Sequence, residues 1–413
     1  MSCFGEIMPQ KISRWILLIL TLIFLTGCSQ TPTDVPDQTS DQPLEGARIT
    51  GASLDEANAG SKSYFTLRVE EAGQPIGIDF RGALMQGSLG VRLLNAEEEI
   101  VWETNVTSVG PFAINTVVKP ETTGEHQLIL SWPGPVQASY NLQWQPGEIE
   151  VPEISPLVLL PGIGMILVAL GYVIYAAVRR LGWAYLGLGA LGWIVTVALK
   201  FAWAIPVNTP LYEALTSALP ETIAHGIFYI YVGALTGIFE VAVTWGVLRY
   251  TKLGQVPWQR ALAFGIGFGA VEALALGVSS LASTAVALFM PASMPLAALE
   301  QIAQVNNVLY GLAPIVERFF TALIHVLTNV LLFYGVAKKE ARWFWLAFAY
   351  KTGIDVVAAF GQFWGLDTLA HLWTIEAIAI LWGIVGWWGT RWVKQHYPSA
   401  EEPSNPKWQE LPF

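Results

Sequence analysis

Residues 264–290, FGIGFGAVEALALGVSSLASTAVALFM, decide the fold class of this chain. The stretch is longer than the roughly 20 apolar residues that a helix needs to cross a bilayer. Its one charged side chain is Glu272. A carboxylate inside a spanning helix is costly, so it is usually retained for function and faces protein rather than lipid. The stretch therefore predicts a membrane protein with a functional carboxylate in its interior.

The composition of the whole chain agrees with this prediction. Of its 413 residues, 53% are hydrophobic and only 13% are charged, which is too apolar for an ordinary soluble enzyme. The 18 Trp residues suit anchoring at membrane interfaces. The net charge is −10, and residues 29–154 hold 18 Asp and Glu against 6 Lys and Arg. This acidic balance argues against a nucleic-acid partner.

The N-terminus has the pattern of a bacterial export signal. Lys11 and Arg14 precede the apolar run 15–25, and the sequence Leu25-Thr26-Gly27-Cys28 follows the spacing of a lipoprotein cleavage box. We expect residues 1–27 to be a lipoprotein signal peptide and Cys28 to be the lipid-modified residue. The alternative is a plain signal or first membrane helix with an incidental cysteine. Residues 28–46 have too few apolar side chains to fold and are predicted to be a disordered tether.

Residues 47–150 alternate between apolar and polar side chains in short runs. Examples are Tyr64-Phe65-Thr66-Leu67-Arg68-Val69 and Tyr140-Asn141-Leu142-Gln143-Trp144, separated by breaks rich in Gly, Pro and Asn. Period-two patterning of this kind is typical of β-strands in a small sandwich. We predict an extracytoplasmic, all-β, sandwich-like domain that binds a partner or acts as a spacer.

The rest of the chain contains a series of apolar stretches, and we predict a seven-helix transmembrane domain over residues 156–393. The expected helices span 156–178, 182–205, 224–249, 260–290, 311–336, 343–362 and 368–390. Lys and Arg gather in alternate loops and are missing from the loops 206–222, 291–310 and 363–367. By the positive-inside rule, this places the tail, residues 394–413, in the cytoplasm and the β-domain outside. The expected location is the bacterial cytoplasmic membrane, with the protein crossing it several times.

Four ionisable residues fall at similar depths in four of these helices: Glu240, Glu272, His325 and Asp355. They lie nine to thirteen residues from the nearest cytoplasmic Lys or Arg, or roughly 13 to 20 Å at a rise of 1.5 Å per residue. We therefore expect them to meet near the middle of the membrane. Carboxylates and an imidazole can hold a divalent metal that activates water, while a further Glu accepts its proton. The alternative is that these residues only pair with other charges and hold the helices together.

Several neighbouring polar residues are expected to support this site. Glu317 and Arg318 lie about two turns from His325, and Lys351 precedes Asp355 by four residues, on the same helix face. Glu376 in the last helix is expected to pair with Lys351. Lys200, near the outer end of its helix, is expected to extend its ammonium group to the membrane interface.

Residues 156–390 resemble the YhfC-type intramembrane metalloproteases, distant relatives of the CAAX prenyl protease and bacteriocin-processing (CPBP) family. The resemblance rests on the order and spacing of five stretches: Ala204-Ile205-Pro206; Gly237-Ile238-Phe239-Glu240; Gly265 to Ala273, which includes Glu272; Glu317-Arg318 with His325; and Asp355. It implies peptide-bond hydrolysis within the membrane and a Zn²⁺ or other divalent cofactor. The implied metal ligands are Glu240, His325 and Asp355, and the implied catalytic base is Glu272.

The chain departs from the family pattern at four of the motif positions. Family members have a second Glu and then an Arg after the first motif's Glu, where this chain has Val241 and Thr244. Phe268 stands where the second motif usually has His, and Lys351 where His usually precedes the Asp. Zinc favours nitrogen and sulfur ligands, so the loss of two imidazoles weakens the predicted metal site.

Three functions agree with these patterns. The first is an intramembrane metalloprotease whose substrate is a membrane protein or peptide. The second is a catalytically inactive pseudoprotease that acts as a binding or scaffolding lipoprotein, with an extracytoplasmic partner for the β-domain. The third is an ion- or proton-coupled transporter, because Glu and His chains also relay protons. All three require contact with the lipid bilayer.

Overall fold

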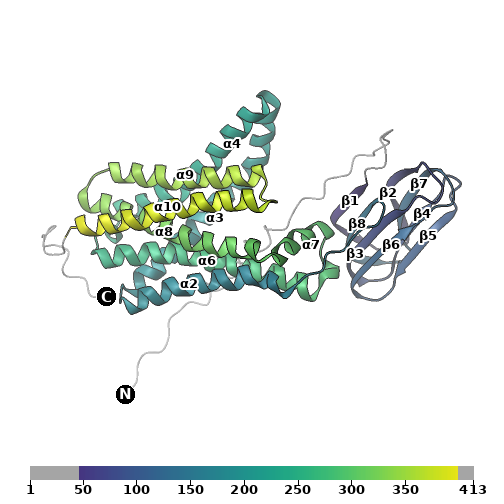
Figure 1. Cartoon of the computed structure of the whole chain (residues 1–413), viewed down its shortest axis with the longest axis horizontal. Helices are drawn as coiled ribbons and strands as arrows, with labels where there is room; N and C mark the ends of the chain where they lie inside the picture. Colours follow the sequence, from purple (N-terminus) through teal and green to yellow (C-terminus); the bar gives the residue numbers. More distant parts are fainter. Residues whose placement is uncertain (1–45, 399–413) are drawn as a thin grey trace, which may run out of the picture. The chain divides into compact units, whose positions relative to one another are not determined.

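A computed structural model of the protein describes residues 46–398. The predicted signal peptide, Cys28, nearly all of the tether and most of the C-terminal tail lie outside these residues. These residues form two compact units: 46–158 with 282–306, and 159–281 with 307–398. Figure 1 shows the strands of the first unit and the helices of the second.

The N-terminal β-domain consists of two four-stranded antiparallel sheets with strand orders β1-β8-β3-β6 and β2-β7-β4-β5. Eight strands in these two orders have jelly-roll connectivity. The predicted all-β, sandwich-like fold is therefore confirmed. The strands are β1 (Ala47–Glu56), β2 (Gly60–Val69), β3 (Ile76–Gln86), β4 (Leu89–Leu94), β5 (Ile100–Val106), β6 (Gly110–Val118), β7 (Gly124–Trp132) and β8 (Val136–Pro146).

Alternation along the strands builds the core of this domain. Ile78 and Phe80 of β3 face inward and are fully buried with Leu128 and Leu142 of the neighbouring strands. The residue between the two, Asp79, points to the other face of the sheet and forms a buried ion pair with Arg81 at 2.5 Å. The short 3₁₀ turn η4 (Pro291–Ser293) belongs to the same unit and contacts β3 and β6.

The second unit is a bundle of long helices. Within the described residues, six helical segments are long and apolar enough to cross a membrane. Its elements are α2 (Leu160–Val178), α3 (Trp183–Ala218), α4 (Glu221–Thr236), η2 (Gly237–Ala242), α5 (Val243–Tyr250), η3 (Lys252–Gly254), α6 (Trp258–Phe289) up to residue 281, α8 (Val308–Lys338), α9 (Arg342–Trp364) and α10 (Leu369–His396). The end of α6, most of η1 (Pro156–Leu159), α7 (Leu296–Ala303) and η5 (Gln304–Asn306) belong to the first unit.

The predicted count of seven spans differs from these six because of α9. This helix has 23 residues and packs against α4 and α8. It contains Arg342, Lys351 and Asp355, and these charged side chains lower its mean hydropathy. Lys351 is buried and Asp355 is partly buried among neighbouring helices, so α9 does not show the uniform apolar character of a helix surrounded by lipid.

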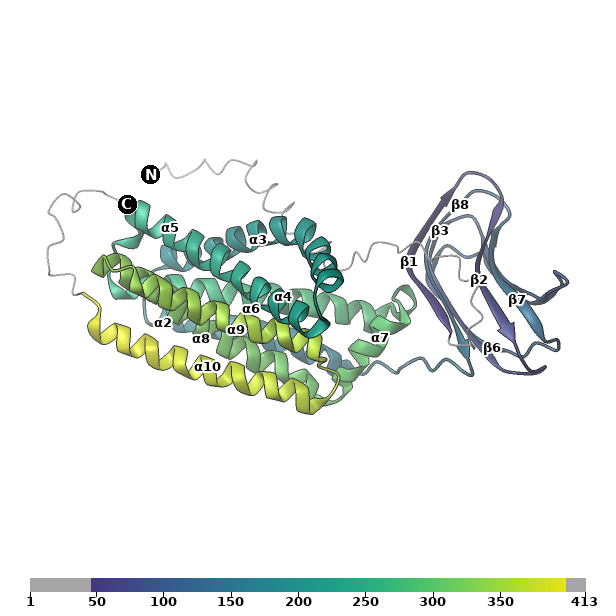
Figure 2. The ribbon, with the colours of Figure 1, turned by 90° about the horizontal axis from the view of Figure 1, so that it is seen from above.

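The expected loop at 206–222 is largely helical. Helix α3 continues to Ala218 with Pro206 and Pro210 inside it, and Figure 2 shows its later turns curving toward α4. Proline removes one backbone hydrogen bond and bends a helix without necessarily ending it. The helix predicted over residues 182–205 therefore runs on through both prolines, which bend it.

Helix α8 is the centre of the bundle. It contacts α2, α9 and α10. Of the most apolar 18-residue stretch of α8, 72% is buried inside the protein. Helix α6 approaches it closely through small residues: Cβ atoms at Gly265 and Gly269 would come within 2.9 Å of α8 backbone atoms. On another face of α6, a Cβ at Gly267 would overlap the Leu186 carbonyl of α3. These glycines let three backbones pack closely and so bring Glu272 next to α8.

Candidate functional site: a buried charge network

The four ionisable residues singled out by the sequence come together in one network. Glu272 of α6 lies beside His325 of α8, with 2.6 Å between Glu272 Oε2 and His325 Nε2. Lys351 of α9 connects the other two, at 2.9 Å from Asp355 Oδ2 and 3.8 Å from Glu240 Oε2. Glu240 is also close enough to interact electrostatically with His325 and Glu272. The predicted convergence inside the bundle thus agrees with the geometry.

Glu272 and His325 belong to the first half of this network. Arg318 of α8 forms ion pairs with Glu272 and with its own neighbour Glu317. The Trp193 indole of α3 donates a hydrogen bond of 2.9 Å to Glu272 Oε2. Both Glu272 oxygens therefore already have charged or hydrogen-bonding partners, which come from two neighbouring helices, α3 and α8.

Glu240 and Asp355 belong to the second half. The Lys200 ammonium of α3 lies 2.6 Å from Glu240 Oε1 and also donates to Thr236 Oγ1 at 3.4 Å. Lys351 donates to both oxygens of Asp355, at 3.1 and 2.9 Å. The i,i+4 pairing of Lys351 with Asp355 was expected from the sequence, whereas the partner of Lys200 was not.

Two expectations about lysine partners are corrected here. Lys200 turns inward to Glu240 instead of reaching the membrane interface. Lys351 pairs with Asp355 and Glu240 rather than with Glu376, which instead interacts electrostatically with Glu317 and Arg318. The rule that intramembrane charges pair could have suggested Lys200 as the missing counter-charge for Glu240.

A π-helical turn, η2, presents Glu240. It interrupts the helical run from α4 to α5, and Glu240 within it is only 5% exposed. Single π-turns inside α-helices occur frequently at functional sites. The turn begins at the second glycine of the sequence Gly233-Ala-Leu-Thr-Gly237, a small-xxx-small motif.

These two glycines bring α9 close to Glu240. A Cβ at Gly233 would come within 2.8 Å of the Thr352 carbonyl, and one at Gly237 within 2.7 Å of the Phe348 ring. The close approach allows the Lys351 ammonium to reach Glu240 from α9. Gly237, which the sequence presents only as part of a family motif, therefore also has a packing role.

The residues present do not fit a divalent metal. Within residues 46–398, no group of three or more His, Cys, Asp and Glu side chains is arranged to hold one. The Phe268 ring occupies the position beside His325, with 5.2 Å between the ring centroids. Glu240 and Asp355, which would be the oxygen ligands, are instead bound by the two ammonium groups.

The charges of the network are close to balance without a metal. Three fixed cations face four carboxylates, and His325 lies beside one of these carboxylates, Glu272. The members are Lys200, Glu240, Glu272, Glu317, Arg318, His325, Lys351 and Asp355. A further two positive charges would be poorly tolerated in such a desolvated place, because an unbalanced buried charge is costly.

Several buried polar atoms of this region make no hydrogen bond within the described residues, and Nδ1 of His325 and Oδ1 of Asn329 are among them. Asn329 uses its amide nitrogen to bind the His325 carbonyl at 2.9 Å. Buried polar atoms are nearly always satisfied, so an unpartnered pair at one helix turn marks a position where a small polar ligand could bind.

Comparisons with known proteins give one informative match. No curated protein matches the chain. Two solved structures, described as "Crystal structure of PirA" and "Bacillus endospore appendages form a novel family of disulfide-linked pili", have identities of 9% and 6% and TM-scores of 0.18, too low to support an argument. They cover 26% and 29% of this chain, and 99% and 100% of their own. Residues 164–379 match the family described as YhfC intramembrane metalloprotease.

Proposed function

Because this chain belongs to the YhfC intramembrane metalloprotease family, we propose that it keeps the family's membrane architecture without its metal chemistry. In this proposal it is a pseudoprotease, a membrane lipoprotein that binds and organises a partner instead of cutting one. The observation that carries the proposal is the pair of ammonium groups, Lys200 and Lys351, on the Glu240 and Asp355 carboxylates.

Electrostatics supports this view of the site. Two lysines supply the same two positive charges as one divalent cation, and they supply them as permanent parts of the chain. A metal would have to displace both ammonium groups from buried carboxylates, leaving the displaced charges without partners at a cost of several kcal/mol each. Phe268 and Lys351 also replace the two imidazoles that the family resemblance would place here. The network thus stabilises the bundle without a metal.

The β-domain is the part proposed to bind a partner. A lipid on Cys28 and the positive-inside pattern would both place this domain on the extracytoplasmic side. The jelly roll has its own apolar core and does not depend on the charge network for its fold. Removal of residues 47–147 is therefore expected to abolish a cellular phenotype that Glu240→Ala and His325→Ala leave intact.

Elemental analysis of the purified full-length protein tests the proposal. We expect much less than one zinc per chain, and no change on His325→Ala. The double variant Phe268→His/Lys351→His is expected to gain zinc, because it adds two imidazoles and removes one ammonium group. The matched control is Phe264→His/Lys351→Met, which places the imidazole one helical turn away and should not gain zinc. Stoichiometric metal in the unaltered protein, lost on His325→Ala, would overturn the proposal.

A second candidate is metal-dependent peptide hydrolysis with Glu240, His325 and Asp355 as ligands and Glu272 as base. Two observations favour this candidate: His325 Nδ1 has no hydrogen-bond partner within the described residues, and Glu240 lies in a π-helical turn. It requires both ammonium groups to leave the carboxylates. Cleavage of a membrane-embedded peptide by the purified protein, abolished by Glu272→Gln, would select this candidate.

A further inference from the structure

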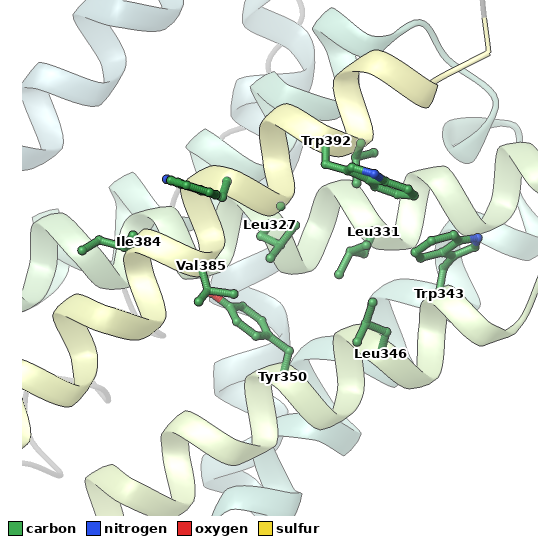
Figure 3. Close-up of a pocket in the computed structure, with 11 residues that line it drawn as sticks. Leu327, Leu331, Trp343, Leu346, Tyr350, Ile384, Val385 and Trp392 are labelled. Carbon is green, nitrogen blue, oxygen red and sulfur yellow. The ribbon is translucent and has the colours of Figure 1, made fainter.

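An apolar groove lies between α9 and α10, and no residue of the charge network lines it. It has a volume of about 600 Å³, and Figure 3 shows side chains from three helices converging on it. Leu327 and Leu331 of α8 form its floor, while Leu346 of α9 and Val385 of α10 line its sides. A cavity of this size and lining suits a hydrocarbon group far better than a polar ligand.

Aromatic contacts between α9 and α10 close the groove at both ends. At one end, Tyr350 stacks on Trp382 at 5.8 Å, and each ring donates a hydrogen bond to the other residue's carbonyl, at 2.8 and 3.0 Å. At the other end, the rings of Trp343 and Trp392 lie 5.5 Å apart. Trp343 and Tyr350 are seven residues apart on α9, so the groove is about 10 Å long on that side.

The remaining side of the groove is open to the surroundings. Leu346, Val385 and Trp388 on its rim are 50%, 57% and 66% exposed. In a membrane this opening faces lipid. A partner's membrane-spanning helix would need a groove about 30 Å long. The groove between the two aromatic contacts is only about a third of that length. A flexible acyl chain that enters from the side fits the available space.

The charges beside one end of the groove complement an anionic head group. Lys338 lies over the Tyr334 ring at 5.9 Å, and Arg342 lies over the Trp343 ring at 5.0 Å. Arg391, at 4.7 Å from the Trp387 ring, adds a third cation on α10. The one carboxylate in the turn between α8 and α9, Glu340, binds Arg342 at 2.7 Å. The positive charge exceeds the negative charge here, and Trp side chains are common at the depth of lipid head groups.

We propose that this groove is a binding site for an anionic phospholipid. One acyl chain lies over Leu327 and Leu331, and the phosphate lies at the end bounded by Trp343 and Trp392, within reach of Lys338 and Arg342. The site is independent of the proposed function, because none of its residues belongs to the charge network.

Native mass spectrometry of the full-length protein in detergent tests this proposal. Phosphatidylglycerol and phosphatidylethanolamine with identical acyl chains are titrated separately, and we expect phosphatidylglycerol to be retained more tightly. Leu346→Trp and Val385→Trp place a large ring in the opening and should abolish retention. Both positions are half-exposed, so the variants should fold normally. Leu381→Trp is the matched control, since Leu381 is 63% exposed on α10 but does not line the groove.

The head-group contact is tested by Lys338→Gln/Arg342→Gln. Each surface cation contributes about 1 kcal/mol to binding an anionic lipid, so this variant should bind phosphatidylglycerol at least about tenfold more weakly and lose the preference over phosphatidylethanolamine. Arg179→Gln/Arg249→Gln, on other helices, is the control. Retention of lipid by Leu346→Trp and Val385→Trp would overturn the proposal, as would equal retention of both lipids by the unaltered protein. Binding of a second copy that the groove variants abolish would also overturn it.

Discussion

At the residue scale, the central fact is that every carboxylate of the predicted site has a basic partner. Glu240 has Lys200 and Lys351, Asp355 has Lys351, and Glu272 has Arg318 and His325. Such partners make buried charges tolerable, although an ion pair is not in itself evidence of high stability. The same residue types that suggested a reactive site therefore also form a self-contained structural network.

Loss of Lys351 should destabilise the protein strongly. Lys351→Met leaves Asp355 without its ion-pair partner and Glu240 with Lys200 alone. Breaking a fully buried pair costs about 3 to 5 kcal/mol, and the loss here should be smaller because the Asp355 side chain is 24% exposed. We expect the unfolding temperature in detergent to fall clearly. Tryptophan fluorescence recorded during heating measures this temperature. Adding Asp355→Leu should restore much of the loss, because an apolar pair replaces the unpaired charge.

Arg342→Met is the control for this measurement. The side chains of Arg342 and Glu340 are 72% and 39% exposed, respectively. Removal of this ion pair should therefore change the free energy of unfolding by less than about 1 kcal/mol. Equal unfolding temperatures for Lys351→Met and the unaltered protein would contradict the view that the network is structural.

At the element scale, glycines decide how close the helices come. Gly265 and Gly269 bring α6 against α8, Gly267 brings it against α3, and the Gly233–Gly237 motif brings α4 against α9. The side chains of the charge network can touch only because these backbones are close. Close helix contacts through small residues are the usual packing mode inside membranes, where lipid gives little hydrophobic drive for helix association.

Gly267→Ala is expected to disturb this packing. Its Cβ would overlap the backbone of α3, and overpacking of this kind costs about 1 to 3 kcal/mol. Thermal unfolding should show the loss. Gly187→Ala on α3 is the matched control: its Cβ would meet nothing within 4 Å, so the variant should be neutral or slightly stabilising. Identical behaviour of the two variants would argue against tight packing of α3 on α6.

At the scale of the whole molecule, an all-β domain and a helical membrane bundle are joined in one chain. The bundle belongs to the YhfC family, whose matched region, residues 164–379, does not include the β-domain. A shared fold does not fix activity, which depends on the residues of the site. Here two ammonium groups lie on the site's carboxylates, which is the basis of the proposed binding role, and the jelly roll is the proposed extracytoplasmic part of it.

The proposed orientation can be checked by cysteine labelling in intact cells. Ala96→Cys lies in an exposed turn of the β-domain, and Lys394→Cys lies at the exposed end of α10. A membrane-impermeant thiol reagent should label Ala96→Cys in intact cells and Lys394→Cys only after permeabilisation, because positively charged loops face the cytoplasm. The unaltered protein measures the background from native cysteines. The reverse labelling pattern would contradict the orientation.

The sequence by itself determined the broad architecture of this protein. Apolar stretches such as residues 264–290 predicted membrane helices, and alternation in runs such as residues 64–69 predicted the β-domain. These features depend on local composition and period, which a sequence displays directly. The sequence also selected the four ionisable residues, because charge in an apolar stretch is conspicuous wherever the helix lies.

The tertiary structure decided the rest, because it depends on which helix faces meet. The partner of Lys200 lies 40 residues away along the chain, and no periodic pattern identifies such a pair. The π-helical turn that contains Glu240 and the continuation of α3 through Pro206 likewise depend on packing against neighbouring helices. The sequence shows where charge is buried, and only the packed bundle shows how that charge is balanced.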